Sequence, residues 1–264
     1  MCTVVILRRP GHPWPLLLAA NRDEMKDRPW RPPGRHWPAR PHVVAGLDEL
    51  AGGSWLGIND HRVVAGVLNR VGSLGPEGGK RTRGELVLLA LEHVDASAAA
   101  TRVSLVDPGA YRSFNMVVAD RQNAYWLRHG GEAPDPKGAK SGAAGIEVFE
   151  LPPGLSMITA RDRNDPASPR VRANLARFEA AAPPDPRTGR WGSWKRLLAS
   201  RRHDSGDGPE TAMTVITESG FETVSSSLIA LPGPPQSVRG NPAGPVWLFA
   251  PGRPDQTPFA PVEL

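Results

Sequence analysis

The residue with the clearest chemical potential is Cys2, the only cysteine of the chain and the residue directly after the initiator methionine. Initiator methionine is normally removed when the next side chain is small. Removal here leaves a thiol and a free α-amine on one residue, with ordinary pKa values of about 8.5 and about 8. Such a residue supplies both a nucleophile and the base that activates it. The alternative is a small, buried apolar side chain near a chain end.

A polar tetrapeptide, Asn21-Arg22-Asp23-Glu24, directly follows the apolar residues 16–20. The pattern predicts strands over residues 1–7 and 14–21, joined by a turn, so that the tetrapeptide returns to the level of Cys2. Polar side chains at such a place need hydrogen-bond partners if they are buried. The hairpin is therefore the element expected to bring charged groups to the thiol.

The next elements are expected to be a second hairpin and a helix. Short strands are predicted over residues 54–58 and 63–68, and a glycine-rich loop over 72–79. The helix after this loop is predicted to begin at Thr82-Arg83-Gly84-Glu85, which matches a capping box. Further along the chain, clusters of strands alternate with pairs of helices. This order indicates the α+β class with largely antiparallel sheets.

Composition limits the kind of protein that this is. The chain has 264 residues, 39% of them hydrophobic and 22% charged, and shows no convincing linker, so we expect one globular domain over residues 1–264. A single cysteine excludes an intramolecular disulfide framework and favours a reducing compartment, so we expect a cytoplasmic protein. No apolar stretch approaches the ~20 residues that a membrane span requires.

One segment carries a feature of nucleic-acid-binding proteins. Arginines and tryptophans alternate with prolines over residues 22–40, and such a mixture can stack on bases and follow phosphates. The net charge of +5 is otherwise spread along the chain, whereas nucleic-acid-binding proteins concentrate it on one face. We therefore favour a proline-rich surface loop whose aromatic rings pack on the body of the protein, and expect no nucleic-acid partner.

Several common sites are excluded by their missing residues. The 7 histidines are scattered without a zinc-ligand spacing. The glycine-rich loop ends in Gly79-Lys80 but lacks the first glycine and the serine or threonine of a phosphate-binding loop, because Leu74 and Arg81 stand there. No dinucleotide-binding glycine pattern follows a strand. We expect no cofactor and no metal.

Taken together, the motifs carry a family resemblance. The chain resembles the NRDE family, also called the transport and Golgi organisation family, over roughly the first 120 residues. The motifs that carry it are Cys2, Asn21-Arg22-Asp23-Glu24, Gly52-Gly53-Ser54-Trp55-Leu56-Gly57-Ile58-Asn59, Ala65-Gly66-Val67-Leu68-Asn69, Arg83-Gly84-Glu85-Leu86 and Tyr111-Arg112-Ser113-Phe114-Asn115.

That family is similar to the N-terminal nucleophile hydrolases, in particular to the penicillin V acylase and bile-salt hydrolase branch. The resemblance implies a four-layer αββα sandwich of two mainly antiparallel sheets, with Cys2 at the start of a central strand. It also implies a catalytic set in which Arg22 contacts the thiolate, Asp23 holds the α-amine and Asn69 donates to the oxyanion. The other polar motif residues, expected to bind substrate, are Asn21, Glu24, Trp55 and Asn59.

General chemistry supports these three roles, and a structural alternative exists for each. A guanidinium lowers a thiol pKa, a carboxylate orients an amine, and one oxyanion donor contributes ~3 kcal/mol to lowering the barrier. Alternatively, Arg22 and Asp23 form a structural ion pair, and Asn69 is a turn residue. The acylase spacing is Arg-x-x-Asp, whereas Arg22 and Asp23 are adjacent, so their side chains leave a strand on opposite faces.

Two functions remain open. The first is an amidohydrolase that cleaves a carbon–nitrogen amide bond, or a thioester or ester, of a small acylated substrate, with Cys2 as nucleophile. The second is a non-catalytic protein that binds or traffics haem or lipid in the same pocket, since the NRDE family is associated with that role. The family's second arginine is expected just before Ser225, where Val224 stands, so a second cationic contact has no match in the sequence.

Overall fold

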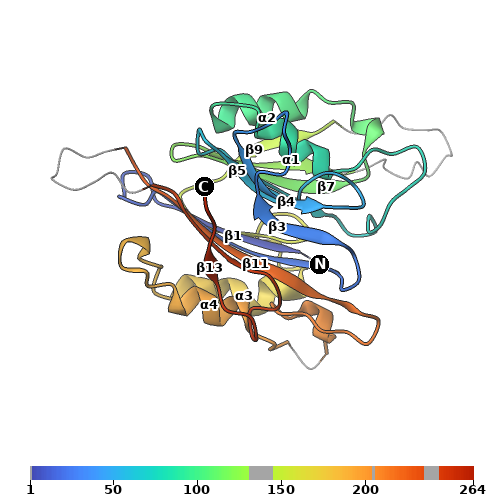
Figure 1. Cartoon of the computed structure of the whole chain (residues 1–264). Helices are drawn as coiled ribbons and strands as arrows, with labels where there is room; N and C mark the ends of the chain where they lie inside the picture. Colours follow the sequence, from blue (N-terminus) through green and yellow to red (C-terminus); the bar gives the residue numbers. More distant parts are fainter. Residues whose placement is uncertain (1, 131–144, 204–205, 235–243) are drawn as a thin grey trace. The chain divides into compact units, whose positions relative to one another are not determined.

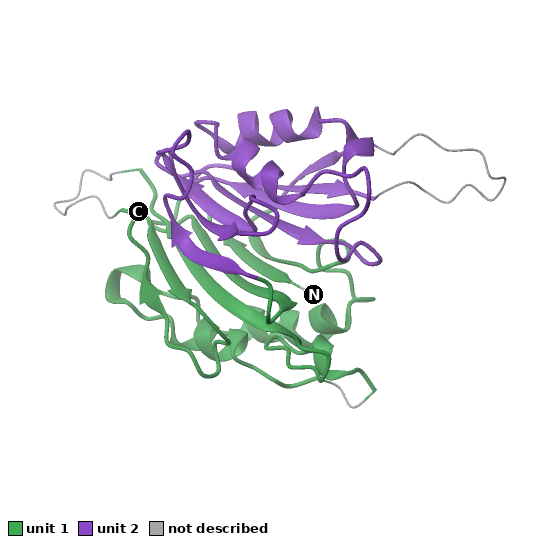
Figure 2. Cartoon of the chain, turned by 45° about the vertical axis from the view of Figure 1, so that its right-hand side comes forward, with its two compact units in different colours: residues 1–28, 152–264 green, residues 29–151 purple. Residues whose placement is uncertain are grey.

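The chain forms two compact units, seen in a computed structural model that describes residues 2–130, 145–203, 206–234 and 244–264. The first unit combines residues 1–28 with 152–264, and the second consists of residues 29–151 (Figure 2). We call them the six-stranded unit and the seven-stranded unit after their sheets. The expectation of a single domain over the whole chain stays a prediction.

The six-stranded unit contains the amino-terminal hairpin in the middle of its sheet. Its strands are β1 (Thr3–Arg8), β2 (Leu16–Met25), β10 (Gly154–Ile158), β11 (Phe221–Leu231), β12 (Val246–Ala250) and β13 (Ala260–Pro261). The strand order is β10-β1-β2-β11-β12-β13, and every neighbouring pair is antiparallel. Both expected strands of the first hairpin are present, and β2 continues through the polar tetrapeptide.

Two helices cover one face of this sheet, α3 (Pro169–Ala180) and α4 (Gly192–Leu198) (Figure 1). Helix α3 begins where Ser168 caps the backbone N–H of Val171 and proline occupies the first turn. Its Phe178 packs edge-on against Trp194 of α4, and both lie in one apolar core with residues of β1, β2 and β11. One short 3-10 helix, Pro186–Thr188, lies between α3 and α4, and another, Pro209–Thr211, follows α4.

The seven-stranded unit is a meander whose strands lie in chain order. They are β3 (Trp30–Gly34), β4 (Val43–Asp48), β5 (Leu56–Asn59), β6 (Val64–Asn69), β7 (Phe114–Ala119), β8 (Ala124–His129) and β9 (Glu147–Glu150), all antiparallel. Helices α1 (Gly84–Ala90) and α2 (Ala96–Ser104), followed by a 3-10 helix at Pro108–Ala110, connect β6 to β7. Their buried faces share a core with this sheet (Figure 1).

Two local expectations are wrong. The arginine- and tryptophan-rich segment contains strand β3 and not only a loop, because its proline residues sit on an edge strand, where a missing backbone N–H is tolerated. The capping box does not form at α1, since the N-cap residue is Arg83, whose side chain makes no cap, and Thr82 accepts only from the backbone N–H of Gly84 at 3.3 Å. Glu85 instead accepts a hydrogen bond from Tyr111 and pairs with Arg81 at 2.6 Å.

The fold class is confirmed, since the chain is α+β with two mainly antiparallel sheets, each with helices against one face. Within the described residues, no helix is both long enough and apolar enough to cross a bilayer.

Candidate functional site

Cys2 lies beside the end of the buried part of β2. It directly precedes β1, whose first residue, Thr3, pairs with Asn21. The Cys2 thiol is partly buried and donates a hydrogen bond to the backbone carbonyl of Asp23, with 3.6 Å between Sγ and O. The first hairpin therefore does bring the polar tetrapeptide to Cys2, and the contact that joins them is to a carbonyl oxygen.

The surroundings of Cys2 raise the pKa of its thiol. Burial is the largest cause, and the negative charge of Asp23 acts in the same direction. The positive amino terminus, the hydrogen bond to the Asp23 carbonyl and the charge of Arg22 lower the pKa, but they do not outweigh the first two. The thiol is therefore protonated near neutral pH, and a base must remove its proton before it can attack an acyl group.

Arg22 and Asp23 are both buried and project to opposite faces of the sheet. Asp23 lies on the face that α3 and α4 cover, and alternation along β2 places Arg22 on the other face. A bulge lies opposite them, where Thr223 pairs with Asp23 and Ser225 pairs with Arg22. The extra residue of the bulge is Val224 on β11. Strand β2 therefore passes through the site without interruption.

The carboxylate of Asp23 is bound by side chains from two other elements. Its Oδ2 accepts from Nη1 of Arg170 at 2.8 Å, and its Oδ1 accepts from Oγ1 of Thr223 at 2.6 Å. The same Arg170 Nη1 lies 2.7 Å from Oγ1 of Thr3, and Nη2 donates to the backbone carbonyl of Glu210 at 2.8 Å. Arg170 is thus a member of the site that the sequence analysis missed.

The sequence holds little signal for Arg170. It lies in the first turn of α3, more than a hundred residues after the polar tetrapeptide, and matches none of the family motifs considered. A cation at a helix N-terminus opposes the helix dipole, so this position is electrostatically unfavourable without a nearby anion. That conflict is the one signal that could have pointed to a buried carboxylate partner.

The flanking residues of the tetrapeptide differ in their surroundings. The Asn21 side chain is buried and donates to the carbonyls of Leu198 and Met213 at 3.0 and 2.8 Å, while its oxygen accepts from Ser226. Glu24 is only partly buried, and its carboxylate lies 3.7 Å from Nε of Arg28. Asn21 therefore holds α4 to the sheet.

Asn59 belongs to the seven-stranded unit, where its side chain closes the β5–β6 hairpin. Its Nδ2 donates to the carbonyls of Leu91 and His93 at 2.8 and 2.7 Å, and its Oδ1 accepts from the backbone N–H of Val63 at 2.9 Å. The amide thus ties the end of α1 to the hairpin. A part in substrate binding stays a prediction for Asn59.

The Gly-Gly-Ser-Trp and Arg-Gly-Glu-Leu motifs meet each other in this unit. A Cβ on Gly53 would lie 2.5 Å from the backbone carbon of Gly84, and the backbone N–H of Ser54 donates to the Gly84 carbonyl at 3.0 Å. Trp55 is partly buried, with its ring against Gly46 and edge-on to Trp30 at 5.7 Å. The two motifs therefore meet in a close backbone contact, which explains Gly53 and Gly84 without reference to chemistry.

Asn69 is the last residue of β6 and is partly buried. It pairs with Phe114, so its side chain lies on the face of the sheet where Phe114 joins the core beneath α1 and α2. On the opposite face, Arg70 donates to Oδ1 of Asn115 at 2.7 Å, and Trp126 donates to the same oxygen at 3.1 Å. Donation from Asn69 to an oxyanion stays a prediction.

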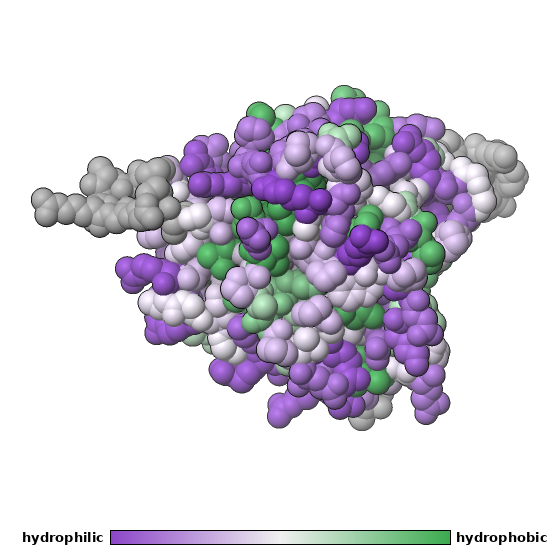
Figure 3. Space-filling model, in the orientation of Figure 1, coloured by the Kyte–Doolittle hydropathy of each residue, from purple (hydrophilic) through white to green (hydrophobic). Residues whose placement is uncertain are grey.

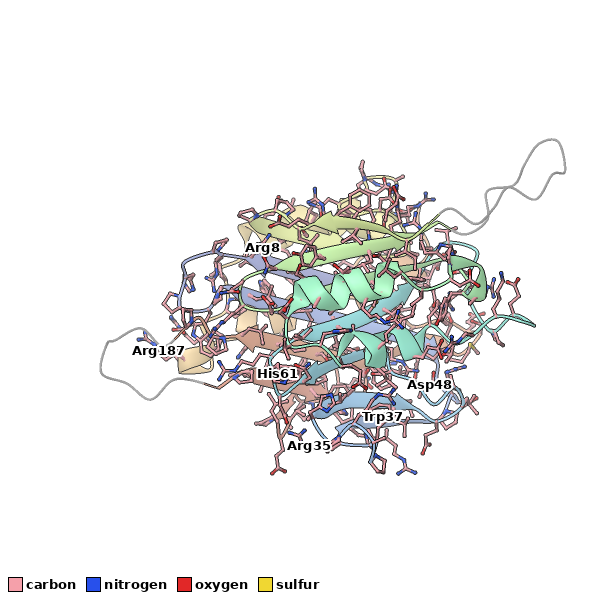
Figure 4. The ribbon with its side chains drawn as sticks, turned by 90° about the horizontal axis from the view of Figure 1, so that it is seen from above. Arg8, Arg35, Trp37, Asp48, His61 and Arg187 are labelled. Atoms are coloured by element: carbon pink, nitrogen blue, oxygen red, sulfur yellow. The ribbon has the colours of Figure 1, made fainter. Side chains whose placement is uncertain are left out.

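The arginines of the proline-rich segment are paired with carboxylates of their own unit. Arg31 lies 2.6 Å from Glu49, Arg35 lies 2.9 Å from Asp60, and Arg40 pairs with Glu92. Arg35 and Trp37 lie on the side of the seven-stranded sheet where β3 and β4 run (Figure 4). The positive charge of this segment is therefore locally compensated.

The rest of the described structure adds no obvious ligand site. Among the described residues, no three histidine, cysteine or acidic side chains lie close enough together to hold a metal ion. The face seen in Figure 3 is mainly hydrophilic, with smaller hydrophobic areas between. The large exposed hydrophobic residues, such as Leu50 and Leu105, are scattered along the sequence.

Comparison with known proteins yields one family. The family model described as "Transport and Golgi organisation 2" matches residues 1–149. A Transport and Golgi organization protein 2 homolog of Homo sapiens is 34% identical over 151 residues, which cover 52% of this chain and 52% of the human protein. The Bos taurus homolog is 37% identical over 111 residues, covering 40% of this chain and 38% of that protein. The matches thus span about half of these relatives' length or less.

The fold has relatives among solved structures. The Caenorhabditis elegans N-acylethanolamine-hydrolyzing acid amidase ortholog matches with a TM-score of 0.53 over 92% of this chain and 98% of that one, at 14% identity. At this identity the likeness concerns the fold alone. The N-terminal nucleophile hydrolase fold implied by the motifs is confirmed.

Proposed function

Because the chain belongs to the Transport and Golgi organisation 2 family, we propose that it is an N-terminal cysteine hydrolase built on that family's fold. The bond cleaved is a carbon–nitrogen amide, or a thioester or ester, of a small acylated substrate. An amidase of the same fold supports the reaction class.

One observation carries this proposal, namely the place of Cys2. The only cysteine of the chain is partly buried, lies next to the amino terminus, and is within the electrostatic reach of a buried Arg22 and a buried Asp23. Clusters of this kind, in which burial and neighbouring charges shift the pKa of a nucleophilic side chain, are concentrated at functional sites.

The chemistry begins with removal of Met1, which leaves the α-amine on Cys2. The neutral amine takes the thiol proton, and the thiolate attacks the acyl carbon. The carbon–nitrogen bond then breaks, the leaving amine receives the proton from the α-ammonium group, and a thioester remains on Cys2. Water hydrolyses the thioester and regenerates the thiol. Arg22 would stabilise the thiolate and Asp23 the ammonium group.

The roles of the remaining predicted residues rest on the family resemblance. Asn69 is proposed as an oxyanion donor, with the ~3 kcal/mol effect on the barrier that such donors have. Glu24 and Trp55 keep partly exposed side chains and remain candidates for substrate contact. Asn21 and Asn59 have their amides engaged with backbone groups, so a purely structural role accounts for both.

Two measurements test the hydrolase. The intact mass should show that the mature chain lacks Met1. A retained Met1 would leave the nitrogen of Cys2 in a peptide bond, so that it could not act as the base. Hydrolysis of a panel of acyl amides, thioesters and esters of increasing chain length should disappear in Cys2→Ala and fall strongly in Cys2→Ser. Turnover that persists in Cys2→Ala would contradict the proposal.

The second candidate function is binding or trafficking of haem or lipid without turnover. The raised pKa of the Cys2 thiol supports this binding function, because it keeps the thiol neutral and a neutral thiol is a poor nucleophile. Haem titration followed by absorption tests it, with Cys2→Ala as the comparison. A spectrum that does not change on mixing would exclude the haem version, and vesicle co-sedimentation tests the lipid version.

A further inference from the structure

Arg170 binds both Thr3, the neighbour of Cys2 in sequence, and Asp23, whose backbone carbonyl accepts the hydrogen bond of the Cys2 thiol. Through Nη1 it reaches Thr3, the residue directly after Cys2, at 2.7 Å. Through the same nitrogen it reaches the carboxylate of Asp23 at 2.8 Å, and the carbonyl of Asp23 is the acceptor of the thiol. The Arg170 guanidinium thus binds β1 through Thr3 and β2 through Asp23, next to Cys2.

The burial of this contact is nearly complete. The side chain of Arg170 is 3% exposed and that of Asp23 is 0% exposed. A buried cation is unfavourable unless it is paired and hydrogen-bonded, and its place in the first turn of α3 adds the unfavourable helix dipole. A well-packed apolar pair would serve stability alone at least as well. The choice of a charged pair at this point therefore indicates a role beyond packing.

We propose that Arg170 is a positioning residue for Cys2, which holds Thr3 and Asp23 in place and compensates the charge that Asp23 directs at the thiol. The charged groups that act on the thiol directly are Asp23, Arg22 and the amino terminus. Arg22 lies on the other face of the strand, whereas Arg170 is bound directly to the Asp23 carboxylate.

The test is the pH dependence of Cys2 alkylation by iodoacetamide, followed by mass. Because Cys2 is the only cysteine, each alkylated thiol reports on this one site. In Arg170→Met the Asp23 carboxylate loses the positive charge of Arg170, so the midpoint of alkylation should move to higher pH by about one unit. Alkylation below the midpoint should then be about tenfold slower. Arg170→Lys, which keeps the charge, should restore most of the rate.

Two further variants make the result specific. In Asp23→Asn/Arg170→Met both charges are absent, so the midpoint should return to the wild-type value or below. Arg177→Met removes another cation from α3, one that donates to Asn174 and Ser200, and should leave the midpoint unchanged. If Arg170→Met does not fold, Arg170→Gln replaces it, because glutamine is neutral and can still donate hydrogen bonds.

A midpoint that is the same in the wild type and the neutral Arg170 variant would overturn the proposal, even if thermal stability fell, because Arg170 would then be merely structural. A lower midpoint in that variant would overturn it too. The inference depends on the proposed hydrolase only for the importance of Cys2. Alkylation needs no substrate, so a chain that hydrolyses nothing still tests Arg170, and a failed Arg170 test leaves the Cys2→Ala result intact.

Discussion

The thiol of Cys2 is held between charges of opposite sign, and the balance favours its neutral form. Arg22 was expected to promote the thiolate, but burial and the carboxylate of Asp23 act more strongly in the other direction. A nucleophile of this kind gains reactivity from a base that takes its proton at the moment of attack. In the proposed mechanism, the α-amine that removal of Met1 would leave on Cys2 is that base.

The raised pKa of Cys2 makes a prediction about stability and pH. Since the native thiol binds its proton more tightly than the unfolded one, its contribution to stability is present below the unfolded pKa of about 8.5 and is lost as pH rises through the native pKa. Urea unfolding of the wild type and Cys2→Ser at pH 7 and pH 10 checks this, because serine does not titrate in this range. Between pH 7 and pH 10 the free energy of unfolding should fall more for the wild type than for Cys2→Ser. An equal fall in both proteins would contradict the prediction.

The Asn59 side chain makes three hydrogen bonds to backbone groups, so Asn59→Ala should destabilise the fold. We expect a loss of about 2–3 kcal/mol, because buried donors and acceptors on both sides are left without partners. Chemical denaturation measures it, with the exposed Gln256→Ala as a control that should be within error of the wild type. If Asn59→Ala retained full stability but lost ligand affinity, the substrate-binding role would be favoured.

At the scale of elements, the contact between Gly53 and Gly84 shows what two of the family motifs do. Strand β5 and helix α1 both begin within a few residues of this contact, and a backbone hydrogen bond from Ser54 to Gly84 joins the two segments. Close approach of two backbones requires glycine on both sides. The motifs are spatial neighbours although some thirty residues of sequence lie between them.

Gly53→Ala should therefore destabilise the protein by about 1–3 kcal/mol, because the added methyl group meets backbone that cannot move aside. Gly78→Ala is the matched control, since a Cβ there meets nothing within 4 Å. That control is expected to be neutral or slightly stabilising. Equal thermal unfolding temperatures for the two variants would contradict this, because they would show that the backbones at Gly53 and Gly84 can move apart to accept a methyl group.

Elements with a strong local pattern were predicted well, and those defined by their neighbours were not. The apolar runs and the turn signals between them sufficed to locate β1 and β2, and likewise β5 and β6. Strand β3 was missed because its two prolines argue against a strand, and only its edge position makes them acceptable. The capping box failed because Glu85 found better partners in Arg81 and Tyr111.

At the scale of the whole molecule, a number of arginines are paired with nearby carboxylates. The segment that looked most like a nucleic-acid platform has Arg31, Arg35 and Arg40 each paired with an acidic residue. Exposed pairs of this kind add little stability. They do reduce the local positive potential on which non-specific binding of nucleic acid depends.

We expect no saturable binding of a labelled single-stranded oligonucleotide in fluorescence anisotropy at low salt. The variant Glu49→Gln/Asp60→Asn/Glu92→Gln leaves the three arginines uncompensated and should bind at least several-fold more tightly, with an affinity that falls steeply as salt rises. Tight, salt-dependent binding by the wild type would contradict the expectation of no nucleic-acid partner.

The sequence by itself determined the fold class, the family and the centre of the candidate site. Those conclusions depend on local patterns and on residue types at short spacing, which the chain order records directly: Cys2, the hairpin that follows it, and the tetrapeptide with Arg22 and Asp23. Only the tertiary structure decided which groups surround the thiol. It brought Arg170 and Thr223 to Asp23, and it balanced burial and Asp23 against Arg22 at the thiol. The reason is physical, because burial and long-range pairing depend on packing between distant segments, and no local pattern encodes that packing.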